Sequence, residues 1–572
     1  MHKLVFAVFD RLPLQFRVLY RQFLLRIVDL EALSIQADIP RFLGQFAGVL
    51  IMFSLIYTLL AWAYLGYAEA GLVSFRFHME HHLIATMMLV VGLFSVLTWD
   101  AAFPDKRDVL VLAPLPVRAR TILLAKIAAS GVILALAVAM LNITAGFFWP
   151  FVLWVRSGGA PGLLRWFGAY WFTMAAASAF VYGAVLALQG LMALVLPRRM
   201  FLRLSALLQI AAFCVFLGGY FLQPTLRLPE QLAAPGNQPV LAYSPTYWFF
   251  ALFQQLTGTM QPGMGWVARR AWVGLALAVA GSLASLLLCY TRTMRKTVEE
   301  PDLVPASRRP VWRPRLGGSL HSAVLYFSVR AVARSRHHRL AFAVYLAIAF
   351  AIGLAFARDT LSMPAPRAVN LDFVVSTMLI SGMIIVGLRK VFALPISLSA
   401  NWVLRITQLR PSEGYIAASR RTLLVLGALP AWLVAAALSL FFRPWTPAAE
   451  HLAILALLCL LFTDLSLVGF AKVPFTCSYL PGKSNFQFVF WAFVMIVLPG
   501  AALGGIQELK ALPHPLQMAA IAGVILAMDT GVWWFNRRRA RSALIHFEEQ
   551  EYEEVMSLGI SLLQPSMRRV EQ

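Results

Sequence analysis

Long apolar runs constrain the fold of this chain more than any other feature of its sequence. Of its 572 residues, 60% are hydrophobic and only 13% are charged, about half the charged share of a soluble protein. A water-soluble core cannot hide so much apolar surface, so lipid must solvate much of the chain. A helix needs about 20 apolar residues to cross a hydrocarbon core about 30 Å thick, so we expect an all-α polytopic membrane protein with twelve spans. The predicted spans are residues 43–65, 82–102, 121–145, 167–193, 200–222, 271–291, 340–357, 371–388, 422–442, 450–470, 487–506 and 516–535.

The placement of basic residues predicts which ends of the spans face the cytoplasm. With the N-terminus inside and the spans alternating, the cytoplasmic segments hold 39 of the 49 lysines and arginines, and the outer segments hold the other ten. Cytoplasmic loops carry such an excess, and one missed span would invert every later loop. We therefore expect both termini in the cytoplasm. No basic stretch is interleaved with stacking aromatic residues, so membrane lipid is an expected partner and nucleic acid is not.

A basic, proline-rich linker divides the chain into two six-span halves. Before its first span, each half has an amphipathic segment, starting near Val18 and Val324, with arginines on one face and apolar side chains on the other. Such a helix lies in the lipid headgroup layer or packs on protein. Two parallel halves imply a pseudo-two-fold axis along the membrane normal. The expected domains are a cytoplasmic amphipathic connecting segment (1–42), a first six-span half (43–291), the cytoplasmic linker with its amphipathic helix (292–339), a second six-span half (340–535) and a cytoplasmic tail (536–572).

A charged loop stiffened by prolines separates the second and third spans of the first half. Residues 99–126 have the sequence WDAAFPDKRDVLVLAPLPVRARTILLAK, and residues 389–421 occupy the same place in the second half. Prolines limit backbone freedom and fixed charges steer a partner, so such loops are typical of a membrane protein that binds a partner on its cytoplasmic side. The predicted contact residues are Pro104, Asp105, Lys106, Arg107, Asp108, Pro116, Arg118, Arg120 and Lys126 in the first loop, and Asn401, Trp402, Arg405, Arg410, Pro411 and Glu413 in the second.

The sequence HMEHH is the one local pattern that suggests a metal. Its residues His78, Glu80, His81 and His82 fit one histidine box of the membrane di-iron desaturases, which need several such boxes. The remaining histidines are scattered, and the predicted topology places this cluster on the outer side. We therefore expect a polar turn at the membrane interface and neither a metal site nor a catalytic residue. A metal-dependent membrane enzyme remains the less favoured alternative.

Several polar residues fall inside predicted spans, and the candidates for an intramembrane polar site are Asn142, Asp464 and Asp529. An intramembrane carboxylate is costly and is a functional candidate for that reason. A proton-coupled secondary transporter would use the two aspartates, whereas the competing interpretation is a hydrogen bond between helices. Neither aspartate has an evident cationic partner within a span, which favours the second interpretation.

The first charged loop resembles a segment of the permeases of type-2 ABC exporters. In these permeases the loop between the second and third spans has a leucine–proline pair, then a basic residue, then an apolar run that ends in lysine. Leu115, Pro116, Arg118 and Lys126 match that pattern. The family's loop forms a coupling helix that sits in a cleft of an ATPase subunit, so the resemblance implies this role for the loop. In the second half, LRPSEGYIAAS replaces the leucine–proline motif.

The resemblance also implies a layout and a function. It places a connecting helix near residues 18–33 and re-entrant helices near 243–258. It implies a fused permease in the bacterial inner membrane that exports a lipid-like or hydrophobic substrate with cytoplasmic ATPase subunits, and it leaves room for further membrane or periplasmic subunits. The sequence PGKS at 481–484 is similar to the end of a phosphate loop, but it lacks the loop's first glycine and a preceding strand. ATP and Mg are therefore expected in the partner, and this chain is expected to hold no cofactor and to catalyse no reaction itself.

Overall fold

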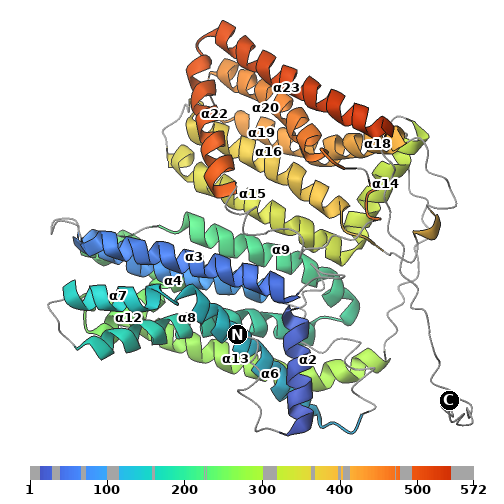
Figure 1. The fold of residues 1–572 in the computed structure, drawn as a ribbon. Helices are drawn as coiled ribbons and strands as arrows, with labels where there is room; N and C mark the ends of the chain where they lie inside the picture. Colours follow the sequence, from blue (N-terminus) through green and yellow to red (C-terminus); the bar gives the residue numbers. More distant parts are fainter. Residues whose placement is uncertain are drawn as a thin grey trace, which may run out of the picture.

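Helices form two bundles that lie one above the other (Figure 1). A helix suits a chain dissolved in lipid because it satisfies its backbone hydrogen bonds within the segment. No strand occurs in the part of the chain that the structure describes. This part of the computed structural model comprises residues 13–28, 39–65, 72–98, 115–156, 162–224, 226, 228–299, 318–362, 368–396, 401–403, 412–442, 444–470, 472–476 and 493–542.

Each bundle has an amphipathic helix followed by long apolar helices. The first bundle contains α2 (Leu14–Val28), α3 (Ile39–Leu65), α4 (Leu72–Leu97), α6 (Ala119–Leu141), α7 (Ala145–Arg156), α8 (Leu163–Val195), α9 (Arg198–Leu222), α10 (Pro229–Ala233), α11 (Gln238–Tyr243), α12 (Pro245–Thr257) and α13 (Gly265–Glu299). The second contains α14 (Ser319–Arg334), α15 (Arg336–Ser362), α16 (Leu371–Phe392), α18 (Ser412–Leu423), α19 (Leu429–Ser439), α20 (Trp445–Ser466), α22 (Leu498–Ala511) and α23 (Pro515–Ser542).

Eight helices in the described ranges are long and apolar enough to cross a membrane. Three shorter apolar segments, Ala47–Ala63, Leu207–Leu222 and Ala341–Ala355, lie within α3, α9 and α15. The chain is therefore an all-α, multi-pass membrane protein. In Figure 1, α2, α14 and α18 lie at the right-hand end of the bundles, and α7, α12 and α22 lie toward the left. We call these the α14 end and the α22 end.

Helix α4 begins at Leu72, well before residue 82, where the sequence predicts the start of the second span. The polar turn expected at residues 78–82 is therefore wrong, because these residues are helical. Their polar side chains lower the local hydropathy that marks a span. In the structure His81 and Glu80 are buried, and α9 and α12 supply polar partners for the cluster.

Two helices of the second bundle contain a π-helical turn just before a proline. Leu424–Ala428 joins α18 to α19, and Phe493–Val497 leads into α22. Pro430 and Pro499 follow at the second position of α19 and α22. Proline has no N–H and its ring clashes with the carbonyl four residues earlier, so a wider turn before it relieves both problems. The third predicted span of this half, residues 422–442, is therefore not one uninterrupted α-helix, because the π-helical turn Leu424–Ala428 interrupts it.

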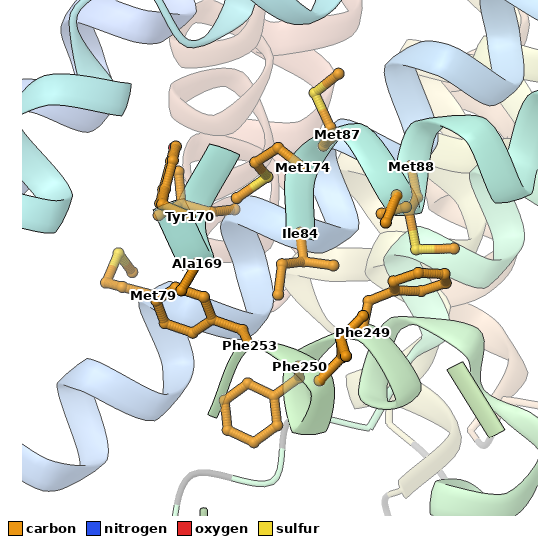
Figure 2. Close-up of a cluster of buried hydrophobic side chains, with 14 of the residues drawn as sticks. Met79, Ile84, Met87, Met88, Ala169, Tyr170, Met174, Phe249, Phe250 and Phe253 are labelled. Carbon is orange, nitrogen blue, oxygen red and sulfur yellow. The ribbon is translucent and has the colours of Figure 1, made fainter. Parts of the chain in front are cut away.

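The short aromatic helix α12 forms the centre of the first bundle. Phe249, Phe250 and Phe253 are almost fully buried, and they face methionines and Ile84 of α4 and the side chains of α8 (Figure 2). The family resemblance implies re-entrant helices near residues 243–258, the segment that contains α12. The structure places it between α4, α8 and α13.

The two bundles meet through α9 and α15, and α4 packs against α9 and contributes to the same contact. The contact is apolar and contains Val96, Phe213 and Leu217 of the first bundle with Ala347 and Ala351 of the second. Alanines on α15 let the helices approach closely, as small residues do in membrane bundles. The fifth apolar helix of one half thus packs on the first of the other.

A glycine permits the close approach of α15 and α16. A Cβ atom built on Gly387 would lie 2.5 Å from Cβ of Tyr345 on α15. That neighbour is fixed to its own backbone, so one helix would have to move. On the same helix, a Cβ on Gly382 would lie 3.7 Å from the Phe462 ring, an ordinary van der Waals contact.

We expect Gly387→Ala to destabilise the protein by about 1–3 kcal/mol, because overpacking forces backbone shifts. Gly382→Ala is the matched control on α16, and it should leave stability unchanged or raise it by up to about 1 kcal/mol, since alanine favours helix. Thermal unfolding of both variants in lipid nanodiscs measures the difference. Equal melting temperatures would show that α15 and α16 do not pack at Gly387.

Candidate functional site

Helix α6 begins with two exposed arginines just after a proline. Val117 donates its N–H to the carbonyl of Leu115 at 2.7 Å, and Arg118 caps the helix with an extended backbone. The side chains of Arg118, Arg120 and Pro116 are exposed, and the first turn of α6 has no acidic residue. Cations at this end oppose the helix dipole, so an anionic surface docked there would stabilise it. The remaining predicted residues of this loop lie outside the described part: Pro104, Asp105, Lys106, Arg107 and Asp108.

Lys126 links this helix start to the amphipathic helix α2. Its side chain is buried, and the ammonium lies over the ring of Phe23 on α2, 5.0 Å from the centroid. Around it, Leu19, Tyr20 and Leu24 of α2 pack against apolar residues of α6. A cation over an aromatic ring is attracted by the ring's quadrupole, most strongly away from water. Lys126 and the apolar residues around it therefore pack α6 against α2.

The second predicted contact stretch is described in part. Asn401 is buried, and its Nδ2 donates to the carbonyl of Thr476 at 2.6 Å, which makes it a structural residue. Trp402 is half exposed, so it remains available to a partner. Three predicted residues, Arg405, Arg410 and Pro411, lie outside the described part, and of Glu413 only the helical backbone is described.

Helix α18 begins at the residue after Pro411 and packs on amphipathic α14, as α6 packs on α2. Arg421 stands ten residues after Pro411, and Lys126 stands ten residues after Pro116. Burial and the nearby Arg421 lower the pKa of His321 on α14. Both halves therefore place a cation of the third apolar helix next to the amphipathic helix.

His338 fixes the junction between α14 and α15. One ring nitrogen, Nδ1, lies 2.6 Å from Oγ of Ser335, and the other, Nε2, bonds the carbonyl of Leu394 at 2.9 Å. The residue precedes the apolar segment of α15, and burial lowers its pKa despite the bond to Leu394. The folded state therefore favours the neutral form of His338.

Protonation of His338 should destabilise the fold as the pH falls. The pKa of His338 is lower in the folded than in the unfolded state. Its contribution to the stability of the fold is therefore complete at pH values above about 6.5, the ordinary pKa of histidine, and is lost as the pH falls below that value. We expect the stability of the wild type to decrease more between neutral and mildly acidic pH than that of His338→Gln, by about 1.4 kcal/mol for each unit of depression. Thermal unfolding in nanodiscs across this range tests it, with His514→Gln, at an exposed position, as the control.

A charged cluster joins α18, α20 and α23 at the α14 end. Arg420 on α18 donates from Nε and Nη2 to the two carboxylate oxygens of Asp464 on α20, at 2.5 and 2.7 Å. Asn536 of α23 donates to the Asp464 carbonyl at 2.7 Å, and Asp529 of α23 is buried beside the pair. The prediction that Asp464 has no cationic partner was wrong. Arg420 belongs by sequence to the loop before residue 422, but α18 carries it into the bundle.

A second polar cluster surrounds the HMEHH sequence at the α22 end. Oε1 of the buried Glu80 lies 3.7 Å from Nε of Arg76, one turn earlier on α4, and Oε2 is 3.5 Å from Nε2 of Gln254 on α12. His81 Nε2 lies 3.0 Å from Oγ1 of Thr246. These contacts attach α4 to the buried helix α12, which accounts for polar residues inside an apolar bundle.

The third histidine of this cluster begins a chain of hydrogen bonds between α3, α4 and α9. His82 Nε2 lies 3.2 Å from Tyr220 Oη, which lies 3.0 Å from Thr86 Oγ1, and Thr86 is 2.7 Å from Tyr57 Oη. His78 stacks on His82 with 5.6 Å between ring centroids. Within the described residues no three histidine, cysteine or acidic side chains are grouped so that they could hold a metal ion.

The second bundle has its own buried acid at the α22 end. Glu508 on α22 lies 2.7 Å from Nδ1 of His451 on α20, whose Nε2 lies 2.8 Å from Oγ1 of Thr377 on α16. All three side chains are buried. This cluster is not evident from the sequence, because Glu508 falls in a predicted loop and His451 lies at the edge of a predicted span.

Removal of the Glu508 carboxyl should destabilise the second bundle strongly. We expect Glu508→Ala to cost about 3 kcal/mol or more, because it leaves a buried imidazole without its partner. Glu508→Gln keeps an oxygen that can accept from His451, so it should cost about 1 kcal/mol. Thermal unfolding in nanodiscs compares the two with Glu450→Ala, an exposed acid next to His451 on α20. Equal losses in the two Glu508 variants would contradict the contact.

Asn142 ends α6 and supports its junction with α7. Its Nδ2 donates to the Val138 carbonyl at 2.8 Å, and its Oδ1 accepts from Tyr170 Oη of α8 at 2.8 Å. The amide is therefore satisfied by the helix end and by the neighbouring helix. This arrangement indicates a structural role for the predicted intramembrane polar residue.

Comparison of the chain with protein-family models, with curated proteins and with solved structures gives no match. The function of the chain is therefore inferred from its own geometry. Its main elements are the two proline-led helix starts with their amphipathic partners, and the buried charged clusters at the two ends.

Proposed function

We propose that this chain is the transmembrane permease of an ATP-driven exporter of the type-2 ABC kind. It would cross the bacterial inner membrane twelve times, with both termini and the α14 end in the cytoplasm. Separate ATPase subunits would supply the energy, and ATP and Mg would be bound there. The observation that carries the proposal is the repeated pairing of an amphipathic helix with a proline-led helix start in both halves.

The order of packing supports a fused two-half permease. In the first half α2 contacts α6 and α8 contacts α13, and in the second half α14 contacts α18 and α20 contacts α23. In each half, the amphipathic helix thus contacts the helix of the third predicted span, and the helix of the fourth predicted span contacts that of the sixth. Two halves of similar layout can rock against one another about a shared contact, which α9 and α15 provide here.

The first helix start has the properties of a coupling element. Arg118 and Arg120 are exposed and form no ion pair among the described residues, whereas Lys126 is buried against α2. An acidic cleft on a partner would satisfy the arginines and the helix dipole together. Movement of that partner would then displace α6 and α2 as one body.

A lipid-like or hydrophobic substrate suits the surface of the helices. Large apolar side chains are exposed along α9, α13 and α23, so a membrane-dissolved molecule could reach the protein from the lipid. A proton-coupled transporter is less well supported, because Arg420 holds both carboxylate oxygens of Asp464 in a contact between helices of one half.

Charge reversal at the first helix start should release the ATPase. We expect an ATP-hydrolysing subunit to co-purify with the wild-type chain from native membranes in mild detergent. Arg118→Glu/Arg120→Glu should reduce the ATPase recovered per permease at least about tenfold, because it turns attraction into repulsion at a buried interface. Quantitative mass spectrometry and ATP hydrolysis of the purified complex measure this.

The control is Arg269→Glu, which reverses an exposed arginine at the start of α13. It lies on the proposed outer side and should leave recovery unchanged. If the wild type carries no ATPase, the proposed function is wrong. If the double variant retains as much ATPase as the control, the function can stand but the assigned contact cannot.

A further inference from the structure

A pocket of about 400 Å³ opens beside the start of α13 in the first bundle. One wall comes from α10 and the first residue of α11, and the other comes from the turn that joins α12 to α13. Two of the side chains that line it, Leu232 and Met264, are apolar and buried. Its volume lies within the range of small-molecule sites in proteins. The pocket shares no residue with the two helix starts or with the buried charged clusters.

The backbone of both walls is fixed by local structure. Met264 donates its N–H to the carbonyl of Gln261 at 3.2 Å, with Pro262 and Gly263 between them. Gly263 has a φ of 84°, and a proline followed by a glycine with positive φ is typical of a type II turn. On the opposite wall, Pro229 occupies the first turn of α10 and fixes the backbone there. A site that is rigid before its ligand arrives loses less entropy on binding.

Four polar side chains line the pocket: Glu230, Gln238, Gln261 and Trp266. Among the described residues, their carboxylate, amide and indole N–H groups form no hydrogen bond. The neighbouring Gln231 differs, because its Oε1 accepts from the N–H of Leu228. An amide both donates and accepts, a carboxylate accepts and an indole N–H donates. The pocket therefore offers a ligand both donors and acceptors that the fold itself does not use.

Charges of both signs flank the pocket. Glu230 is the one charged residue among the described residues that line it. Arg270, one turn after Trp266 on α13, places its guanidinium 5.2 Å from the centroid of the Trp266 ring and donates to the Ala242 carbonyl at 2.6 Å. A cationic ligand would meet this arginine and an anionic ligand would meet Glu230, and like charges brought together are unfavourable. The pocket therefore favours a neutral ligand that is rich in hydrogen-bonding groups.

We propose that this pocket binds a neutral pyranose unit of a saccharide. Ring hydroxyls both donate and accept hydrogen bonds, so they suit two amides and a carboxylate together. The C–H face of a pyranose is apolar and packs on an indole, which combines an apolar body with a polar N–H. A hydrocarbon in the same place would leave these polar groups unsatisfied. This inference does not rest on the proposed transport function, because it uses no residue of the two helix starts.

Saturation-transfer difference NMR of the full-length protein in phosphatidylcholine nanodiscs tests the pocket, with the signals from empty nanodiscs subtracted. The probes are the methyl pyranosides of glucose, galactose, mannose and N-acetylglucosamine, with choline and glucuronate as charged comparisons. We expect transfer to at least one neutral pyranoside and weaker binding of choline and of glucuronate. The proposal fails if no neutral pyranoside receives saturation, or if a charged probe binds as tightly as the best neutral one.

A double variant and its matched control assign the binding to this pocket. Glu230→Ala/Gln261→Ala removes two side chains that form no hydrogen bond within the described fold. It should leave the melting temperature unchanged and weaken pyranoside binding at least about tenfold, because a charged and a neutral hydrogen bond are lost. Glu450→Ala/Gln517→Ala removes the same two kinds of side chain from exposed positions of the second bundle and should leave binding unchanged. Binding that is retained in the pocket variant, or weakened equally in the control, would overturn the proposal.

Discussion

Every polar group within the apolar helices must find its partner inside the protein, because lipid offers none. This constraint explains where the helices of each bundle touch. Glu80 is joined to Gln254 and Arg76, Glu508 to His451, and Asp464 to Arg420. Each such contact connects different helices or stabilises the helix that carries it. The polar residues therefore define the relative positions of helices whose remaining surface is uniformly apolar.

The amino-acid pattern is sufficient to predict the helices but not their ends or their contacts. Hydropathy locates the apolar helices, and the amphipathic segments near Val18 and Val324 correspond to α2 and α14. It fails at α4, where three histidines and Glu80 lower the average although they lie in the same helix. Hydropathy measures a preference for lipid, and these side chains face other helices.

The candidate sites were predicted only in part for a related reason. The exposure of Arg118 and Arg120 agrees with their place in a charged loop. By contrast, Arg420 has the same sequence context but is bound to Asp464, forty-four residues later. No local spacing indicates that pair, because it depends on how α18 and α20 pack. In the sequence, the only indication of this ion pair is a basic residue at the edge of one predicted span and an acidic residue inside another.

The two halves use different means to join corresponding helices. In the first half, a Cβ on Gly183 would lie 3.0 Å from the Ala278 carbonyl oxygen, so α8 and α13 approach closely through small residues. In the second half, Asp464 with Asn536 and Asp529 joins α20 to α23. The first contact is made by small apolar residues, whereas the second is a hydrogen bond beside the Arg420–Asp464 ion pair. If ATPase subunits drive both halves through their helix starts, the first half transmits the movement through a fixed pair of helices. In the second half the same movement meets a polar contact beside the Arg420–Asp464 ion pair, so the two halves need not respond alike.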